Sequence, residues 1–209
     1  MTLKERALAI VNRLKEVYPM AHCELDFKNP LELLIATILS AQCTDKRVNL
    51  VTPSLFKKYQ STQAFAKATQ EQIEEEVKST GFYRNKAKSI RLTCAEIESK
   101  HGGMVPKTME ELKALPGVGR KTANVVLGNA FGKNEGIVVD THVSRLAQRI
   151  GLTQQITPEK IEQDLMKLIP QELWTDFSHW LIWHGRRRCS ARKPDCNQCE
   201  VREICIRRF

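Results

Sequence analysis

Apolar residues recur at the spacing of an α-helix along nearly the whole chain, and the alternation that a strand needs is almost absent. One helical face shows the pattern well, with positions i, i+3, i+4 and i+7 all apolar: Val143, Leu146, Ala147 and Ile150. Such a set lies on one side of a helix and must be buried. Only the run Ile-Val-Val at 137–139 could form a strand. The sequence therefore predicts an all-α protein.

Prolines and glycines mark where these helices begin and end. Asn29 and Thr157 each precede a proline, an order that places a capping side chain just before the first helical position. We therefore expect helices to begin at Pro30 and Pro158. Gly151 follows the last residue of an apolar face and is expected to end that helix.

The chain is basic, with 33 Lys and Arg against 24 Asp and Glu and a net charge of +9. This balance favours a polyanionic partner, although a merely soluble basic protein has the same balance. The first twenty residues interleave charged and apolar positions and do not form a secretory signal. The longest apolar stretch, at 33–39, is too short to span a bilayer. We expect a cytoplasmic protein without a membrane partner, in which the cysteines stay reduced.

Four of the seven cysteines lie close together near the C-terminus, with the spacing C-x6-C-x2-C-x5-C: Cys189, Cys196, Cys199 and Cys205. The surrounding stretch 183–209 holds eight Lys or Arg and three Asp or Glu, so it is too short and too charged to form its own core. Four thiolates in such a segment indicate a metal centre, either a structural zinc or an iron–sulfur cluster. The remaining three are scattered among apolar neighbours and are expected to be small core residues: Cys23, Cys43 and Cys94.

The stretch LPGVGRKTANVV, residues 115–126, predicts the end of a short helix, a tight turn and a second helix from Arg120. Gly117 and Gly119 let the backbone bend with its amides facing one way, and the helix start adds unpaired N–H groups. Such a concavity binds a phosphate. A plain helix-turn-helix corner has the same pattern. The G-x4-G-K-[ST] spacing of a nucleotide-binding loop is absent.

Two ionisable residues near helix starts are candidates for chemistry. Lys121 lies on the first turn beside Arg120, where the helix dipole and the neighbouring cation favour a neutral amine that can form a Schiff base. A phosphate-binding or solvated lysine is the alternative. Asp140 directly precedes a helix, so it can cap that helix or exchange a proton in a cleft. His142 is interpreted as a first-turn surface residue.

These motifs carry a resemblance when they are taken in order with VVDTHV, LLIATILSAQCTD (33–45) and TGFYRNKA (80–87). Over essentially its whole length the chain resembles the endonuclease III family of DNA glycosylases, which are helix-hairpin-helix proteins with a [4Fe-4S] cluster. The resemblance implies two helical domains flanking a DNA-binding cleft. One is a six-helix barrel with the helix-hairpin-helix at 22–133, and the other is an iron–sulfur cluster domain formed by 1–21 and 134–209.

The resemblance also implies a bifunctional DNA glycosylase and AP lyase of base excision repair. Lys121 would attack the sugar of an everted nucleotide, Asp140 would assist across the cleft, and the resulting Schiff base would lead to β-elimination. The implied partner is double-stranded DNA containing damaged bases or abasic sites, with oxidised pyrimidines as the expected lesions. We expect a monomer that works at a bacterial-type nucleoid in the cytoplasm.

The same resemblance gives roles to further residues. The four clustered cysteines would hold the [4Fe-4S] cluster. Gln42 corresponds to a polar wedge, and Phe82 stands where a second wedge is usually a smaller aliphatic residue. Taken locally, Gln42 is equally well a loop amide and Phe82 a core anchor. DNA contacts are expected from the hairpin and from basic side chains beside the cluster: Gly117, Gly119, Arg120, Arg186, Arg187, Arg188, Arg192 and Lys193.

Two other interpretations fit part of the pattern. Cluster-bearing adenine glycosylases are similar, but they lack a lysine at the hairpin position and continue past the cluster. Here Lys121 is present and the sequence ends four residues after Cys205, which argues against that group. A non-catalytic DNA-binding module with a hairpin and a structural zinc is the more distant alternative.

Overall fold

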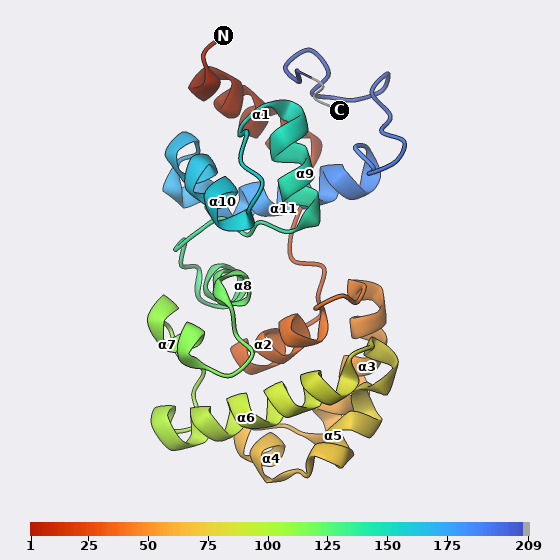
Figure 1. Ribbon diagram of the computed structural model, residues 1–209, viewed down its shortest axis with the longest axis vertical. Coiled ribbons are helices and arrows are strands. Elements are labelled where there is room, and N and C mark those ends of the chain that lie inside the picture. The colour runs from red at the N-terminus through yellow and green to blue at the C-terminus, as the bar shows by residue number, and fades with distance from the viewer. Residues whose placement is uncertain (207–209) are drawn as a thin grey trace. The chain divides into compact units, whose positions relative to one another are not determined.

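The structure, a computed structural model, describes residues 1–206, and within them every regular element is a helix (Figure 1). The predicted all-α class is confirmed. The run 137–139 is buried, but it does not form a strand. Its apolar side chains therefore serve the core from an extended connection between helices.

The chain divides into two compact units, each with its own hydrophobic core. We name them the hairpin unit, Cys23–Lys133, and the cysteine unit, which joins Met1–His22 to the chain from Asn134 onward. The second unit is discontinuous in sequence. Its first helix therefore packs against elements that lie more than a hundred residues later in the chain.

The hairpin unit contains seven α-helices and one short 3-10 helix in the described chain. They are α2 (Pro30–Leu39), α3 (Asp45–Lys58), α4 (Thr62–Lys67), α5 (Gln70–Val77), η1 (Lys78–Thr80), α6 (Tyr83–His101), α7 (Met109–Ala114) and α8 (Arg120–Phe131). The long helix α6 packs along α4 and α5, while α2 packs on α8 (Figure 1). This packing fixes the start of α8, which follows the glycine turn.

The cysteine unit contains α1 (Leu3–Val17), α9 (Thr141–Ile150), α10 (Pro158–Leu168), η2 (Gln171–Leu173) and α11 (Trp174–Arg187). Helix α11 packs against both α1 and α9 (Figure 1). The segment that follows α11 holds the four clustered cysteines, and it has no helix or strand as far as residue 206. Its position therefore depends on contacts with the helices.

The predicted helix boundaries are largely confirmed. Helix α2 begins at Pro30 after Asn29, whose side chain accepts a hydrogen bond from the backbone N–H of Glu32 at 2.9 Å. Helix α10 begins at Pro158, but the expected cap is wrong, because the Thr157 side chain makes no capping hydrogen bond. Gly151 ends α9 in the left-handed conformation, with φ of 82°.

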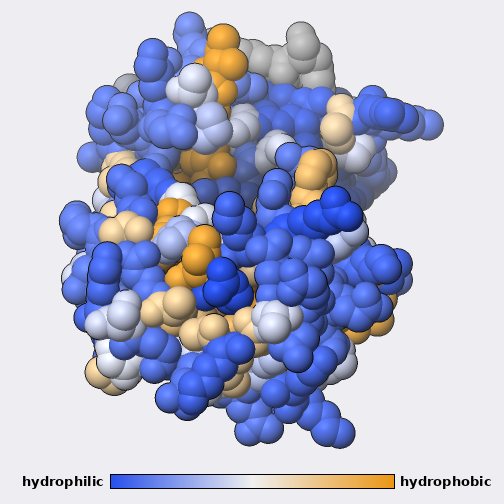
Figure 2. All heavy atoms as spheres, turned by 60° about the horizontal axis from the view of Figure 1, so that its bottom comes forward, coloured by the Kyte–Doolittle hydropathy of each residue, from blue (hydrophilic) through white to orange (hydrophobic). Residues whose placement is uncertain are grey.

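The predicted apolar face of α9 is confirmed, since all four of its residues are buried. Among the scattered cysteines, Cys94 is fully buried, whereas Cys23 and Cys43 are half-buried against the core of the hairpin unit. Hydrophilic side chains cover most of the face seen in Figure 2, and hydrophobic ones form small separate groups there. Within residues 1–206, no helix combines the length and apolar character that crossing a bilayer requires.

Candidate functional site

The turn between α7 and α8 requires glycine at one of its two glycine positions. Gly117 has φ of 75°, and a Cβ added there would lie 2.7 Å from Cβ of Ser89, so both conformation and space exclude a side chain. Gly119 has φ of −90° and open space around it. Thr93 on α6 donates a hydrogen bond to the carbonyl of Pro116 and so anchors the turn. The predicted helix, turn and second helix are confirmed.

Two helices of the hairpin unit begin without a side-chain cap. These are α8, which follows Gly119, and α6, which follows Phe82. The other five α-helices of the unit each begin with a Ser, Thr or Asn side chain that accepts a backbone N–H. An uncapped start leaves backbone donors and the positive end of the helix dipole for an anion. The glycine turn predicted this feature at α8, and no motif predicted it at α6.

Gln42 and Phe82 share an unusual backbone conformation. Within residues 1–206 they are the only non-glycine residues with positive φ, at 52° and 48°. Each such residue costs roughly 1–2 kcal/mol. Phe82 is 64% exposed, so the alternative of a core anchor is wrong, and Gln42 is exposed as well. Strained backbone that presents exposed side chains is a feature of binding sites.

A buried lysine lies beneath the Phe82 loop. Lys86 is 4% exposed, and its Nζ donates a hydrogen bond to the carbonyl of Thr80 at 2.7 Å. Its backbone N–H bonds the carbonyl of Phe82 at 3.1 Å. Burial lowers the pKa of Lys86, while electrostatic contact with Cys43, the neighbour of Gln42, raises it. Lys86 thus anchors the loop from Thr80 to Phe82, a role that no sequence motif indicated.

The two candidate catalytic residues lie in different units. Lys121 is exposed on the first turn of α8, and the neighbouring Arg120 is half-buried. Asp140 is the N-cap of α9, with Oδ1 accepting the backbone N–H groups of His142 and Val143 at 2.8 Å each. The capping interpretation of Asp140 is therefore confirmed. Its Oδ2 makes no hydrogen bond within the described chain.

Helix α9 also binds the segment that carries the cysteines. Arg145 donates to the carbonyl of Cys189 at 3.0 Å. Arg149 donates to the carbonyls of Ser190 and Ala191 at 2.8 and 2.7 Å, and its Nη1 lies 3.5 Å from Sγ of Cys189. Two arginines one helical turn apart thus hold the first cysteine and its neighbours. His142, expected at the surface, is half-buried and lies 3.1 Å from the guanidinium of Arg145.

The four clustered cysteines line one common cavity of the cysteine unit. Its wall consists of Leu146, Arg149, Ile150, His184, Arg188, Cys189, Pro194, Asp195, Cys196, Cys199, Val201 and Cys205. Burial raises the pKa of the Cys199 thiol to about 11, and the charges of Cys205, Glu200 and Cys189 act in the same direction. Thiols that oppose each other's ionisation become thiolates when metal cations lie among them. The donor set therefore fits a thiolate-bound metal centre.

The basic residues near this cavity differ in what they contact. Arg188 donates to Glu200 and Asp195 at 2.8 Å each, so its charge is used within the unit. The Arg187 guanidinium stacks on the ring of Trp183, with 3.8 Å between its Cζ and the ring centroid. The other predicted contacts have exposed side chains: Arg186, Arg192 and Lys193.

Comparison with known proteins gives a consistent family. Residues 35–171 match the sequence profile of the HhH-GPD superfamily of base excision DNA repair proteins. The chain is 55% identical to the Endonuclease III of Synechocystis sp. over 202 residues, which cover 97% of this chain and 92% of the relative. It is 43% identical to Endonuclease III of Escherichia coli K12 over 202 residues, or 97% and 95% of the two chains.

Solved structures agree with these sequence relatives. A non-covalent complex of an Endonuclease III with DNA matches 99% of this chain and 96% of its own, with a TM-score of 0.94 and 43% identity. An Endonuclease III trapped with DNA as a covalent intermediate matches 99% and 97%, with the same TM-score and identity. The predicted resemblance is confirmed: the chain belongs to the HhH-GPD superfamily of base excision DNA repair proteins, within its Endonuclease III group.

Proposed function

We propose that this chain is a bifunctional DNA glycosylase and AP lyase that removes oxidised pyrimidines from duplex DNA and cleaves the strand by β-elimination. Family membership and the likeness to an Endonuclease III trapped covalently with DNA support an enzyme of this kind. The observation that carries the proposal is Lys121, an exposed amine on the uncapped first turn of α8, directly after the glycine turn.

Binding to DNA uses backbone donors first. The N–H groups at the start of α8 can hold a phosphodiester, because they have no side-chain cap and lie at the positive helix end. The start of α6 offers a second such position. Everting the damaged nucleotide costs a few kcal/mol. We assign Gln42 and Phe82 to the space that the nucleotide leaves, since both are exposed and held in strained backbone.

The chemistry then needs one amine and one carboxylate. Nζ of Lys121 forms a bond to C1′ of the everted nucleotide, and the glycosidic bond breaks with its electron pair going to the base. Asp140 takes up a proton or stabilises positive charge on the sugar. The C1′–O4′ bond of the sugar ring then breaks, a proton goes to O4′, and C1′ becomes doubly bonded to Nζ as a Schiff base. This Schiff base acidifies the hydrogen on C2′, and removal of that proton breaks the C3′–O bond, so that the 3′ phosphate leaves. One lysine therefore accounts for both the glycosylase and the lyase step.

We assign a [4Fe-4S] cluster to the four clustered cysteines. Their shared cavity, their uneven spacing and the family all support it, and the cluster would fix a segment that has no helix of its own. The exposed side chains of Arg192 and Lys193 would then lie on an ordered loop that can contact the DNA backbone. The bacterial relatives and the DNA substrate support a location at the nucleoid.

The test is covalent trapping of the Schiff base with borohydride on duplexes that carry different oxidised pyrimidines, an oxidised purine or an abasic site. Lys121→Gln should lose trapping and strand cleavage while it keeps duplex binding, because only the nucleophile is removed. Lys113→Gln is the matched control, since Lys113 is an exposed lysine in the last turn of α7. Undiminished trapping in Lys121→Gln refutes the assignment, and equal trapping of all lesions refutes the pyrimidine preference.

A further inference from the structure

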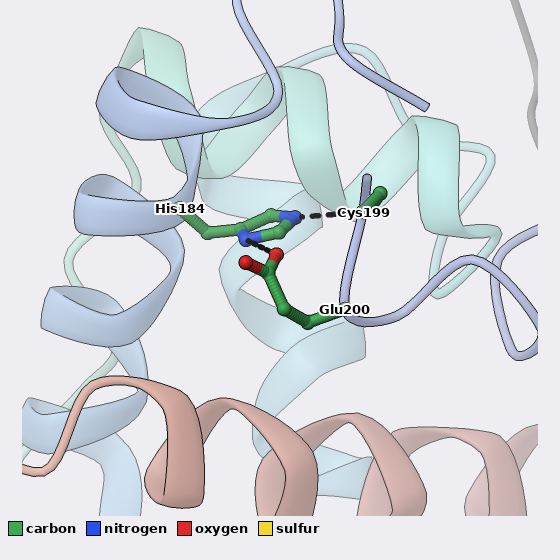
Figure 3. Close-up of side chains that lie close together, drawn as sticks. All are labelled: His184, Cys199 and Glu200. Carbon is green, nitrogen blue, oxygen red and sulfur yellow. Dashed lines mark hydrogen bonds and ion pairs between the residues drawn. The ribbon is translucent and has the colours of Figure 1, made fainter. Parts of the chain in front are cut away.

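His184 on α11 contacts two groups that the proposed reaction does not use. Its side chain is buried, with 1% of its surface exposed. The Nδ1 atom lies 3.0 Å from the hydroxyl of Tyr18, the residue that ends α1. The Nε2 atom lies 3.4 Å from Sγ of Cys199 (Figure 3). His184 therefore connects the first helix of the chain to one of the four clustered cysteines.

The same histidine is not suited to bind a separate metal ion. His184, Cys199 and Glu200 each offer a ligand atom within 4.8 Å of the others. However, Figure 3 shows that Cys199 faces Nε2 whereas Glu200 faces Nδ1, at 3.9 Å. One ion cannot bind both nitrogens of one ring. The Glu200 carboxylate also accepts hydrogen bonds from Arg188, at 2.8 Å for the shortest.

The partners of the ring decide which nitrogen carries hydrogen. A metal-bound thiolate can only accept a hydrogen bond, so the nitrogen that faces Cys199 must be the donor. In the neutral ring Nδ1 is then an acceptor, and the hydroxyl of Tyr18 supplies the hydrogen that it needs. The result is a two-step chain, in which Tyr18 O–H donates to Nδ1 of His184 and Nε2–H donates to the sulfur.

We propose that Tyr18 and His184 tune the electronic properties of the iron–sulfur cluster by delivering one N–H donor to the Cys199 ligand. This inference rests on the cluster assigned under the proposed function. A hydrogen bond to a ligating sulfur stabilises the more negative, reduced form of a cluster and so raises its reduction potential. His184 acts through Cys199, which makes it a positioning residue, and Tyr18 fixes the tautomer that this role requires.

The experiment measures the midpoint potential of the purified holoprotein by voltammetry, together with its iron and acid-labile sulfide. His184→Leu removes both hydrogen bonds and should shift the potential to a more negative value. Tyr18→Phe should shift the potential in the same direction by a smaller amount. In that variant His184 remains, but the hydroxyl that fixes its tautomer is gone. His184→Gln places an amide N–H near the position of Nε2 and should restore most of the wild-type potential.

The matched control is His179→Leu, which removes another buried histidine of α11 that does not line the cysteine cavity. It should leave the potential at the wild-type value. A wild-type potential in His184→Leu refutes the inference but leaves the cluster in place. If His184→Leu does not fold, a wild-type potential in Tyr18→Phe refutes it instead. A wild-type protein without iron and sulfide overturns the cofactor assignment, and the inference with it.

Discussion

The two carboxylate oxygens of Asp140 have different roles, one in the cap of α9 and the other in the proposed chemistry. Oδ1 accepts two backbone N–H groups at the start of α9, whereas Oδ2 makes no hydrogen bond within residues 1–206. Asp140→Asn should keep the cap and lose base release, because the amide oxygen accepts the same bonds without the charge. Asp140→Ala should also lose about 1 kcal/mol of unfolding free energy. Single-turnover base release and urea unfolding separate the two effects; base release at the wild-type rate in Asp140→Asn contradicts the proposed role.

At the scale of single residues, sequence predicts a cap more readily than a long-range contact. Asn29 and Asp140 cap the helices that they were expected to cap, because the interaction involves only the next three residues. Lys86 gave no such signal, since a buried lysine depends on loops that fold over it. The pair of Tyr18 and His184 is separated by 166 positions, and no local pattern joins its members.

At the scale of elements, the α7–α8 turn separates two glycines that look equivalent in sequence. Gly117→Ala should lower the unfolding free energy by about 2 kcal/mol and weaken duplex binding, because Cβ meets positive φ and the side chain of Ser89. Gly119→Ala should lower stability by less than about 1 kcal/mol, since its φ is ordinary, its surroundings are open, and only the N-cap preference for glycine over alanine is lost. Urea unfolding and fluorescence anisotropy with duplex DNA measure both. Equal losses in the two variants would show that the turn is not shaped by Gly117.

The helices themselves were predictable, and the way they hold the last segment was not. The period of the apolar residues predicted the buried face of α9, and Gly151 predicted where this helix ends. The same helix uses Arg145 and Arg149 to bind backbone carbonyls about forty residues later in the chain. Arginines on a polar helix face have the same appearance in sequence whether they face solvent or a loop. The spacing of the cysteines in the sequence therefore predicted that they form one group. It did not predict that Arg145 and Arg149 hold the segment that carries them.

At the scale of the whole molecule, acid should weaken the cysteine unit through His179. Burial, with a smaller contribution from nearby His22, lowers the pKa of His179 to about 4. The stabilisation is complete above the unfolded pKa near 6.5 and is lost as pH falls through 4, because the unfolded chain binds the proton first. The full loss is about 3 kcal/mol. The unfolding free energy measured in urea should fall more steeply between pH 7 and pH 4 for wild type than for His179→Gln. Parallel curves for the two proteins would contradict this prediction.

The discontinuous cysteine unit also sets an order for events during synthesis. Helix α1 is synthesised before the hairpin unit, yet the side chains that cover its apolar face come from residue 137 onward. Residues 23–133 follow it with a complete core of their own. Helix α1 is therefore made before the hairpin unit but cannot be buried until after it, and its apolar side stays open to water or to a chaperone while the hairpin unit is already able to fold.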